Sequence, residues 1–96
     1  MEDYVLIPAI DFCIGHHIEL DMIQVLGEEG LIEIIELEET YFIPEHQIKK
    51  LEKIIVFHKD LNINLEGVET IIDLLERMES MQQHIIQLEN KLQRFS

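Results

Sequence analysis

The 96-residue sequence lacks tryptophan, holds a single cysteine and has only short apolar runs. Because Cys13 has no second thiol to pair with, an internal disulfide and a metal site built from several thiolates are excluded. A bilayer requires about 20 consecutive apolar residues, so we expect no membrane-spanning segment. The acidic start, Met1 to Tyr4, lacks the basic residues of a signal peptide. We therefore expect a cytoplasmic protein with a reduced thiol.

Positive charge is missing from the first half of the chain. Met1 to Gln47 contains twelve Asp or Glu residues and no Lys or Arg, whereas from Lys49 onward eight acids meet seven bases. The formal net charge is −13. A protein that contacts about 6–10 phosphates needs roughly that many positive groups on one face. The charge distribution disfavours nucleic acid as a partner and favours a polar, basic protein surface.

The residue patterns of enzymes and metal sites are also missing. The sequence shows no Ser-His-Asp arrangement, no Gly-rich phosphate loop and no paired catalytic carboxylates. His16 and His17 are adjacent, so they would point apart on a helix, and no closed set of metal ligands accompanies them. Cys13 lies on an apolar face, which is typical of a buried, unreactive thiol. We expect no enzymatic activity, no metal and no cofactor.

Hydrophobic spacing predicts a mainly helical chain with a small β-hairpin. A β-prone run ends at Pro8, and a short helix follows over residues 9–16 with Ile10, Cys13 and Ile14 on its inner face. The next helix is predicted over 20–29, stopped by Gly30. Its expected inward residues are Met22, Ile23, Val25 and Leu26.

After residue 30 the spacing of apolar residues changes from that of a helix to that of β-strands. Residues 31–37 and 41–43 are predicted as the two strands of a hairpin, with a turn over 38–40 that lacks glycine. A third helix is predicted over 44–61, closed by Asn62 in the left-handed conformation. Asn64 is then the N-cap of a last helix over 65–94. Residues 1–64 would form one domain and 65–96 a coiled-coil helix.

The last helix carries an apolar stripe with alternating steps of three and four residues. Val68, Ile72 and Leu75 widen its first part, which we expect to pack on the domain, while the rest is a strict heptad seam. Burying each large side chain contributes about 1.5–3 kcal/mol, so we predict a dimer, with charges that weakly favour parallel helices. The predicted interface consists of Ile71, Leu74, Met78, Met81, Ile85, Leu88, Leu92 and Phe95.

The predicted order of elements is the layout of a MerR-like winged helix-turn-helix domain followed by a long dimerisation helix. Short motifs resemble the CbpM-type chaperone modulators over about residues 4–75. These motifs are Asp11-Phe12-Cys13, Ile18, the run Glu28-Glu29-Gly30-Leu31-Ile32, and the junction from Asp60 to Glu69. Tyr41-Phe42-Ile43 falls where that family has an aromatic-x-aromatic pair, and Ile43 departs from it.

The chain also departs from the DNA-binding MerR regulators. Those proteins carry a Thr-x-Arg-Tyr-Tyr-Glu type run in the second helix, and aligning on Gly30-Leu31 places Met22, Gln24, Val25, Leu26 and Gly27 there. The wing, which is rich in Arg in the regulators, carries glutamates instead. The resemblance therefore favours a MerR-like fold from which the groups that hold phosphates are missing.

The resemblance implies a protein that binds the J-domain of a DnaJ/CbpA-like co-chaperone and inhibits its stimulation of a DnaK-type chaperone. The alternatives are a MerR-family DNA-binding transcriptional regulator, an adaptor that only dimerises and, third, an enzyme that carries no recognisable motif. Placement on the second helix and the wing gives the candidate partner-binding residues: Asp21, Gln24, Glu28, Glu33 and Glu36.

Overall fold

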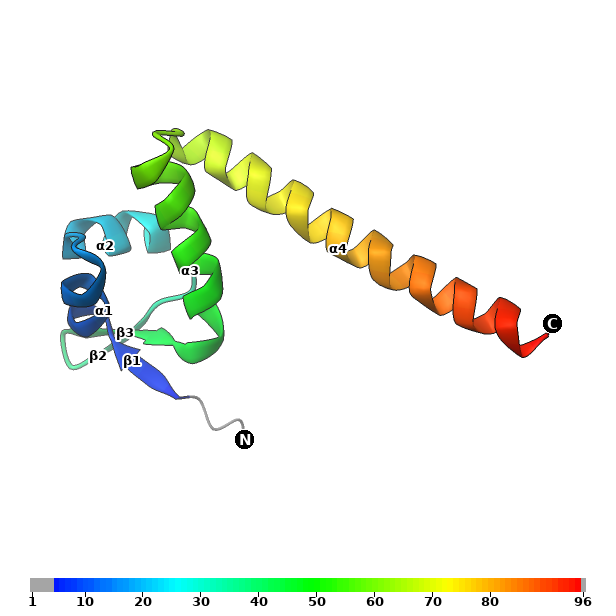
Figure 1. Cartoon of the computed structure of the whole chain (residues 1–96). Coiled ribbons are helices and arrows are strands. Elements are labelled where there is room, and N and C mark those ends of the chain that lie inside the picture. The colour runs from blue at the N-terminus through cyan, green and yellow to red at the C-terminus, as the bar shows by residue number, and fades with distance from the viewer. Residues whose placement is uncertain (1–4, 96) are drawn as a thin grey trace. The chain divides into compact units, whose positions relative to one another are not determined.

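A computed structural model describes residues 5–95 of the chain (Figure 1). The chain divides into two compact units, Met1–Val56 and Phe57–Ser96. The first unit contains the helices α1 to α3 and a small sheet, and the second contains the long helix α4. Within residues 5–95, no helix is long and apolar enough to cross a membrane.

The first unit contains a helix-turn-helix formed by α1 (Ala9–His16) and α2 (Leu20–Glu28). The predicted bounds of α1 are confirmed. Its predicted inner face is right for Cys13, which is buried, but wrong for Ile10 and Ile14, which are 51% and 68% exposed; Phe12 is buried instead. Apolar residues occupy more than one side of this helix, and the bulky Phe12 ring occupies the core in place of the two isoleucines.

Helix α2 buries Ile23 and Leu26, as predicted, but Val25 is 40% exposed and was wrongly placed inward. The predicted stop at Gly30 is confirmed, since this residue has a φ of 77°. The backbone N–H of Leu31 donates to the carbonyl of Leu26 at 2.9 Å, which satisfies a terminal carbonyl of the helix.

The sheet has three antiparallel strands in the order β1-β3-β2: the predicted β-prone run before Pro8 joins the hairpin, a pairing that was not predicted. Strand β1 (Leu6–Pro8) pairs with β3 (Thr40–Pro44), which also pairs with β2 (Ile35–Leu37). The prediction of a strand from residue 31 is wrong, because Leu31 and Ile32 are buried in irregular chain before β2. Tyr4, the start of the predicted first run, lies outside the described residues.

The hairpin turn is made by two glutamates in the left-handed conformation. Glu38 and Glu39 have φ values of 49° and 62°, the sign that a type I′ turn requires at both central positions. This two-residue turn sets Leu37 opposite Thr40 and Glu36 opposite Tyr41. The turn therefore fixes which hairpin side chains share a face.

The third predicted helix is divided into three pieces. A 3-10 turn, η1 (Glu45–Gln47), precedes α3 (Ile48–Ile55), and a π-helical turn, η2 (Val56–Asp60), follows it. The chain after η2 folds back, so that the backbone N–H of Ile63 donates to the carbonyl of Phe57 at 2.9 Å. A hydrogen bond of 2.7 Å also joins His58 Nδ1 to the carbonyl oxygen of Ile63. These contacts favour the wider turn over regular α-helix.

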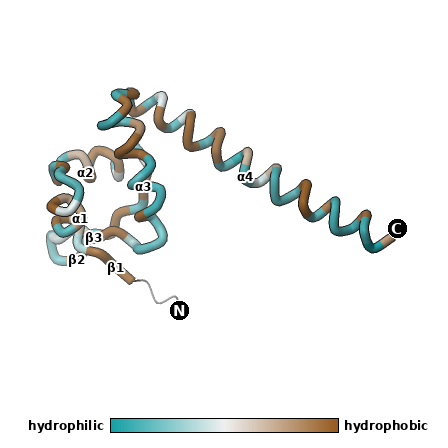
Figure 2. Tube along the Cα trace, in the orientation of Figure 1, coloured by the Kyte–Doolittle hydropathy of each residue, from teal (hydrophilic) through white to brown (hydrophobic). Residues whose placement is uncertain are grey.

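The last helix, α4, spans Leu65–Arg94, as predicted, and is drawn as one continuous helix in Figure 1. Asn62 has the predicted positive φ, 61°. The side chain of Asn64 caps α4 by accepting a hydrogen bond from the backbone N–H of Gly67. In Figure 2, hydrophobic positions recur along the whole of this helix between hydrophilic ones.

Candidate functional site

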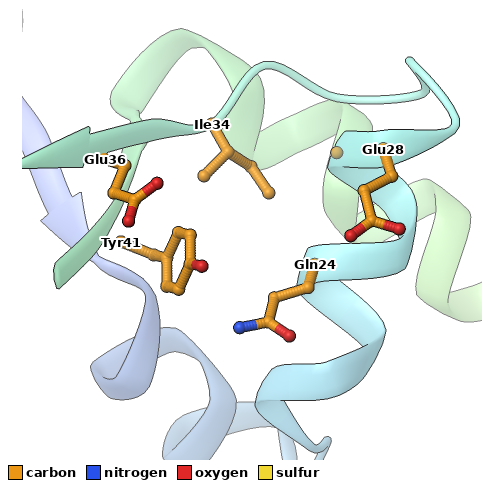
Figure 3. A pocket seen from close by; sticks show the side chains of 6 residues that line it. Gln24, Glu28, Ile34, Glu36 and Tyr41 are labelled. Atoms are coloured by element: carbon orange, nitrogen blue, oxygen red, sulfur yellow. The ribbon is translucent and has the colours of Figure 1, made fainter. Parts of the chain in front are cut away.

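A pocket of about 340 Å³ opens between α2 and the β2–β3 hairpin (Figure 3). Ligand pockets in proteins range over about 300–1,000 Å³, so this one has room for a single side chain or a small group. We call it the α2–hairpin pocket. It is lined by Gln24, Gly27, Glu28, Ile34, Glu36 and Tyr41.

One wall of the pocket is a single face of α2. Gln24, Gly27 and Glu28 have the i, i+3, i+4 spacing that places side chains on the same side of a helix. Gly27 lets the hairpin approach closely, because a Cβ atom on this residue would lie 2.5 Å from Cδ1 of Ile34. The missing side chain thus allows Ile34 to rest against the helix and form an apolar part of the pocket.

The other wall follows from the register of the hairpin. Glu36 lies directly opposite Tyr41 in the ladder, and Ile34 precedes Glu36 by two residues. Because side chains two apart along extended chain share a face, these three project to the same side. Figure 3 shows the Tyr41 ring reaching from the hairpin toward α2, with the Glu36 carboxylate beside it.

The polar groups of the pocket are available to a ligand. Glu28 and Glu36 are exposed, whereas Gln24 and Tyr41 are half-buried. Among residues 5–95, none of these four side chains forms a hydrogen bond or an ion pair. Two carboxylates, an amide and a phenol ring around a small apolar floor repel anions and can accept hydrogen bonds from a cation.

Three of the five predicted partner-binding residues, Gln24, Glu28 and Glu36, come together in this pocket. The structure places the other two elsewhere. Asp21 is exposed one turn earlier on α2. Glu33 lies with η1, where its carboxylate is 3.4 Å from Nε2 of His46 and its backbone N–H donates to Oε1 of Gln47 at 2.9 Å.

Tyr41, Ile34 and Gly27 also line the pocket, although none of them was predicted from the sequence as a site residue. A signal was present for two of them: a two-residue turn at Glu38-Glu39 sets Glu36 opposite Tyr41, and alternation then adds Ile34 to that face. The close approach at Gly27 had no comparable signal, because it depends on packing between α2 and the hairpin.

Other reactive groups of the first unit serve its packing. Cys13 is 3% exposed, as expected for a buried residue, and burial raises the pKa of its thiol above the usual value. His16 stacks on the Phe12 ring, with centroids 3.9 Å apart, and its Nε2 lies 3.6 Å from a Glu52 carboxylate oxygen. Across residues 5–95, no three His, Cys, Asp or Glu side chains are grouped closely enough to hold a metal ion.

A second candidate surface is the apolar stripe of α4. Ile71, its first member, is half-buried, and the later members are between 47% and 89% exposed in the single chain. A row of large side chains in water along about 37 Å of helix is a candidate contact surface for another chain. The exposed members are Leu74, Met78, Met81, Ile85, Leu88, Leu92 and Phe95.

Comparison with known proteins identifies the family. Residues 7–90 match the family described as MerR HTH family regulatory protein. No curated protein and no solved structure gives a match. The match covers the helix-turn-helix, the sheet, α3 and most of α4. The chain therefore belongs to the MerR helix-turn-helix family of regulatory proteins.

Proposed function

We propose that this chain is a protein-binding member of the MerR family, a CbpM-type modulator that binds the J-domain of a DnaJ/CbpA-like co-chaperone. In this proposal it inhibits stimulation of a DnaK-type chaperone by that co-chaperone. The observation that carries the proposal is the charge of α2 and its C-cap: Asp21 and Glu28 are exposed on the helix, and Glu29 is exposed at its end. A helix with this surface repels the phosphates of DNA.

The hairpin extends the same charge. Glu36, Glu38 and Glu39 are exposed on the hairpin, and the lysines of the first unit are all on α3, at positions 49, 50 and 53. Complementary fields accelerate association and select partners by charge. A partner with a basic helix fits this surface, and the resemblance to CbpM-type modulators points to the basic helix beside the His-Pro-Asp loop of a J-domain.

Inhibition follows from competition for that helix. A J-domain engages the chaperone through its basic helix, so a modulator that covers the helix prevents this contact. Neither covalent chemistry nor a cofactor is needed for such an effect. The proposed activity depends only on occupancy of the J-domain and therefore rises with the concentration of the modulator.

The functional unit is proposed to be a homodimer. The stripe from Leu74 to Phe95 is exposed in the single chain, and pairing two stripes removes both from water. Each buried side chain would contribute about 1.5–3 kcal/mol before losses of chain entropy are counted. Asn64 and Gly67, which form the cap of α4, lie before the first residue of the proposed seam.

Calorimetry with a purified J-domain tests the proposal. We expect binding that weakens as salt rises, because the screening length falls to about 8 Å at 0.15 M ionic strength. Glu33→Lys with Glu36→Lys should slow association, and J-stimulated ATP hydrolysis by the chaperone should drop with the wild-type protein and recover with this variant. Glu69→Lys with Glu79→Lys is the matched control, because it makes the same charge change on exposed positions of α4.

The possible results separate the parts of the proposal. If the J-domain produces no heat and no salt-sensitive binding, the modulator assignment is wrong. If it binds and the Glu33/Glu36 variant behaves like the control, the modulator function stands and the interface must lie away from the hairpin.

A further inference from the structure

We infer that the α2–hairpin pocket is the receptor for one arginine side chain of the partner. This inference deepens the proposed function and rests on it for the nature of the partner, a protein with a basic surface. The observations are the pocket itself, its volume of about 340 Å³ and the four unengaged polar side chains around it. This volume has room for a long side chain of the partner.

The two carboxylates favour a cation that donates hydrogen bonds in more than one direction. Glu28 stands on α2 and Glu36 on the hairpin, so their carboxylates belong to opposite walls (Figure 3). A guanidinium group has five N–H donors fixed in a plane and can donate to two carboxylates at once. An ammonium group is a compact, strongly hydrated charge with no such planar fork.

The neutral lining also suits arginine. The Tyr41 ring gives a flat π face on which a guanidinium plane stacks, and the Gln24 amide oxygen can accept a further N–H bond. Ile34, which rests against Gly27, supplies an apolar surface for the methylene stem. Each part of an arginine side chain thus has a matching group in the pocket.

The direct test is NMR titration of the full-length protein with N-acetyl-arginine methylamide. We expect saturable shifts at the backbone amides of Gln24, Gly27, Glu28, Glu36 and Tyr41, with affinity about fivefold or more above that of the lysine analogue. The neutral citrulline analogue, which keeps the shape but lacks the charge, should give no saturable shift. Equal affinity for the arginine and lysine analogues, or equal shifts at Glu38 and Glu39, would overturn the inference.

Charge-neutral variants test the pocket against the J-domain. Glu28→Gln with Glu36→Gln preserves the side-chain shapes and should weaken J-domain binding by about tenfold or more, since hydrogen bonds to charged groups are the strong ones. Glu38→Gln with Glu39→Gln makes the same change in net charge at the hairpin tip and should weaken binding less than threefold. Equal losses in the two variants would refute a specific pocket.

A variant with a larger side chain tests whether the open space of the α2–hairpin pocket is needed for binding. Gly27→Leu adds a large side chain to the pocket lining without altering charge, and even its Cβ would meet Ile34, so the shape of the pocket must change. It should abolish the saturable shifts and weaken J-domain binding about tenfold or more. Gly15→Leu is the matched control, since a Cβ at Gly15 meets nothing within 4 Å. If Gly27→Leu does not fold, as judged by circular dichroism, the comparison of Glu28→Gln with Glu36→Gln against Glu38→Gln with Glu39→Gln decides whether the pocket is specific.

Failure of the inference and failure of the proposed function give different results. Saturable arginine binding without J-domain binding would retain the pocket and reject the modulator function. J-domain binding that is indifferent to the Glu28/Glu36 and Gly27 variants would retain the function and reject the pocket as its arginine receptor.

Discussion

The Asn64 side-chain oxygen accepts a hydrogen bond of 2.7 Å from the backbone N–H of Gly67, the third residue of α4. This bond satisfies one of the four N–H groups that the first turn of any helix leaves without an intrahelical partner. Asn64 has an extended backbone, with φ −65° and ψ 160°, so the chain turns from irregular structure into helix at this residue.

Asn64→Ala should therefore destabilise the start of α4 by about 1 kcal/mol. Hydrogen exchange at the amides of residues 66–68 should accelerate about fivefold. Asn90→Ala is the control and should stabilise α4 instead. This exposed position lies inside the helix, where alanine has a higher helix propensity than asparagine. If both variants accelerate exchange equally, the cap does not stabilise the helix.

The hairpin turn offers a stabilising substitution. Glu38 and Glu39 occupy the left-handed conformation, which costs a residue with a Cβ about 1–2 kcal/mol. Glu38→Asn with Glu39→Gly supplies the pair that type I′ turns prefer, and thermal unfolding should occur at a higher temperature. Glu38→Gln with Glu39→Gln removes the same charges and keeps the strained backbone. An equal gain in this control would assign the effect to charge.

Because the Cys13 thiol is buried, we predict that the free energy of unfolding depends on pH. Burial raises the pKa of Cys13, so on raising the pH the unfolded state ionises first, at about 8.5. The free energy of unfolding should fall above that pH, until the folded-state thiol also ionises. Denaturant titrations over this range measure the slope, and Cys13→Ala should remove this contribution. A slope that persists in Cys13→Ala would have to come from another group.

A single substitution in the predicted α4 seam should separate the dimer into monomers. Ile85→Asp places a charge in the middle of the stripe, where leaving it unpaired and buried costs several kcal/mol. Light scattering should show a monomer. Ile86→Asp is the matched control, because Ile86 is 57% exposed and lies beside the stripe rather than on it. A wild-type monomer at tens of micromolar would contradict the seam.

Duplex DNA should not bind at physiological salt. The reason is the charge of α2 and the hairpin, which lack the basic groups that neutralise phosphates. Mobility shift with genomic fragments is the measurement. A sequence-specific shift at nanomolar protein would favour a transcriptional regulator over a chaperone modulator.

Local signals in the sequence predicted the limits of several elements. Pro8 and Gly30 bracket the helix-turn-helix, and Asn62 and Asn64 mark the approach to α4, because each of these residues has a restricted or unusual backbone preference. These preferences act within a few residues, so no knowledge of the rest of the fold is needed to use them.

Features that depend on distant parts of the chain were not predictable in the same way. Ile10 and Ile14 could have formed the inner face of α1, and only the packing of Phe12 and Cys13 decides otherwise. The pairing of β1 with β3 joins residues more than thirty positions apart. The pocket depends on both the hairpin register and the approach of Ile34 to α2, so only Gln24, Glu28 and Glu36 of its lining were anticipated.

The placement of Glu28 and Glu36 on opposite walls of one pocket has an energetic consequence for the free protein. Folding brings like charges of the acidic half closer together than they are in the unfolded chain, and such self-repulsion opposes the compact state. Added salt therefore weakens this repulsion and stabilises the free protein. It also weakens the attraction between the protein and a basic partner. A bound cation would relieve the same repulsion from within, so partner binding should raise the unfolding temperature most at low ionic strength.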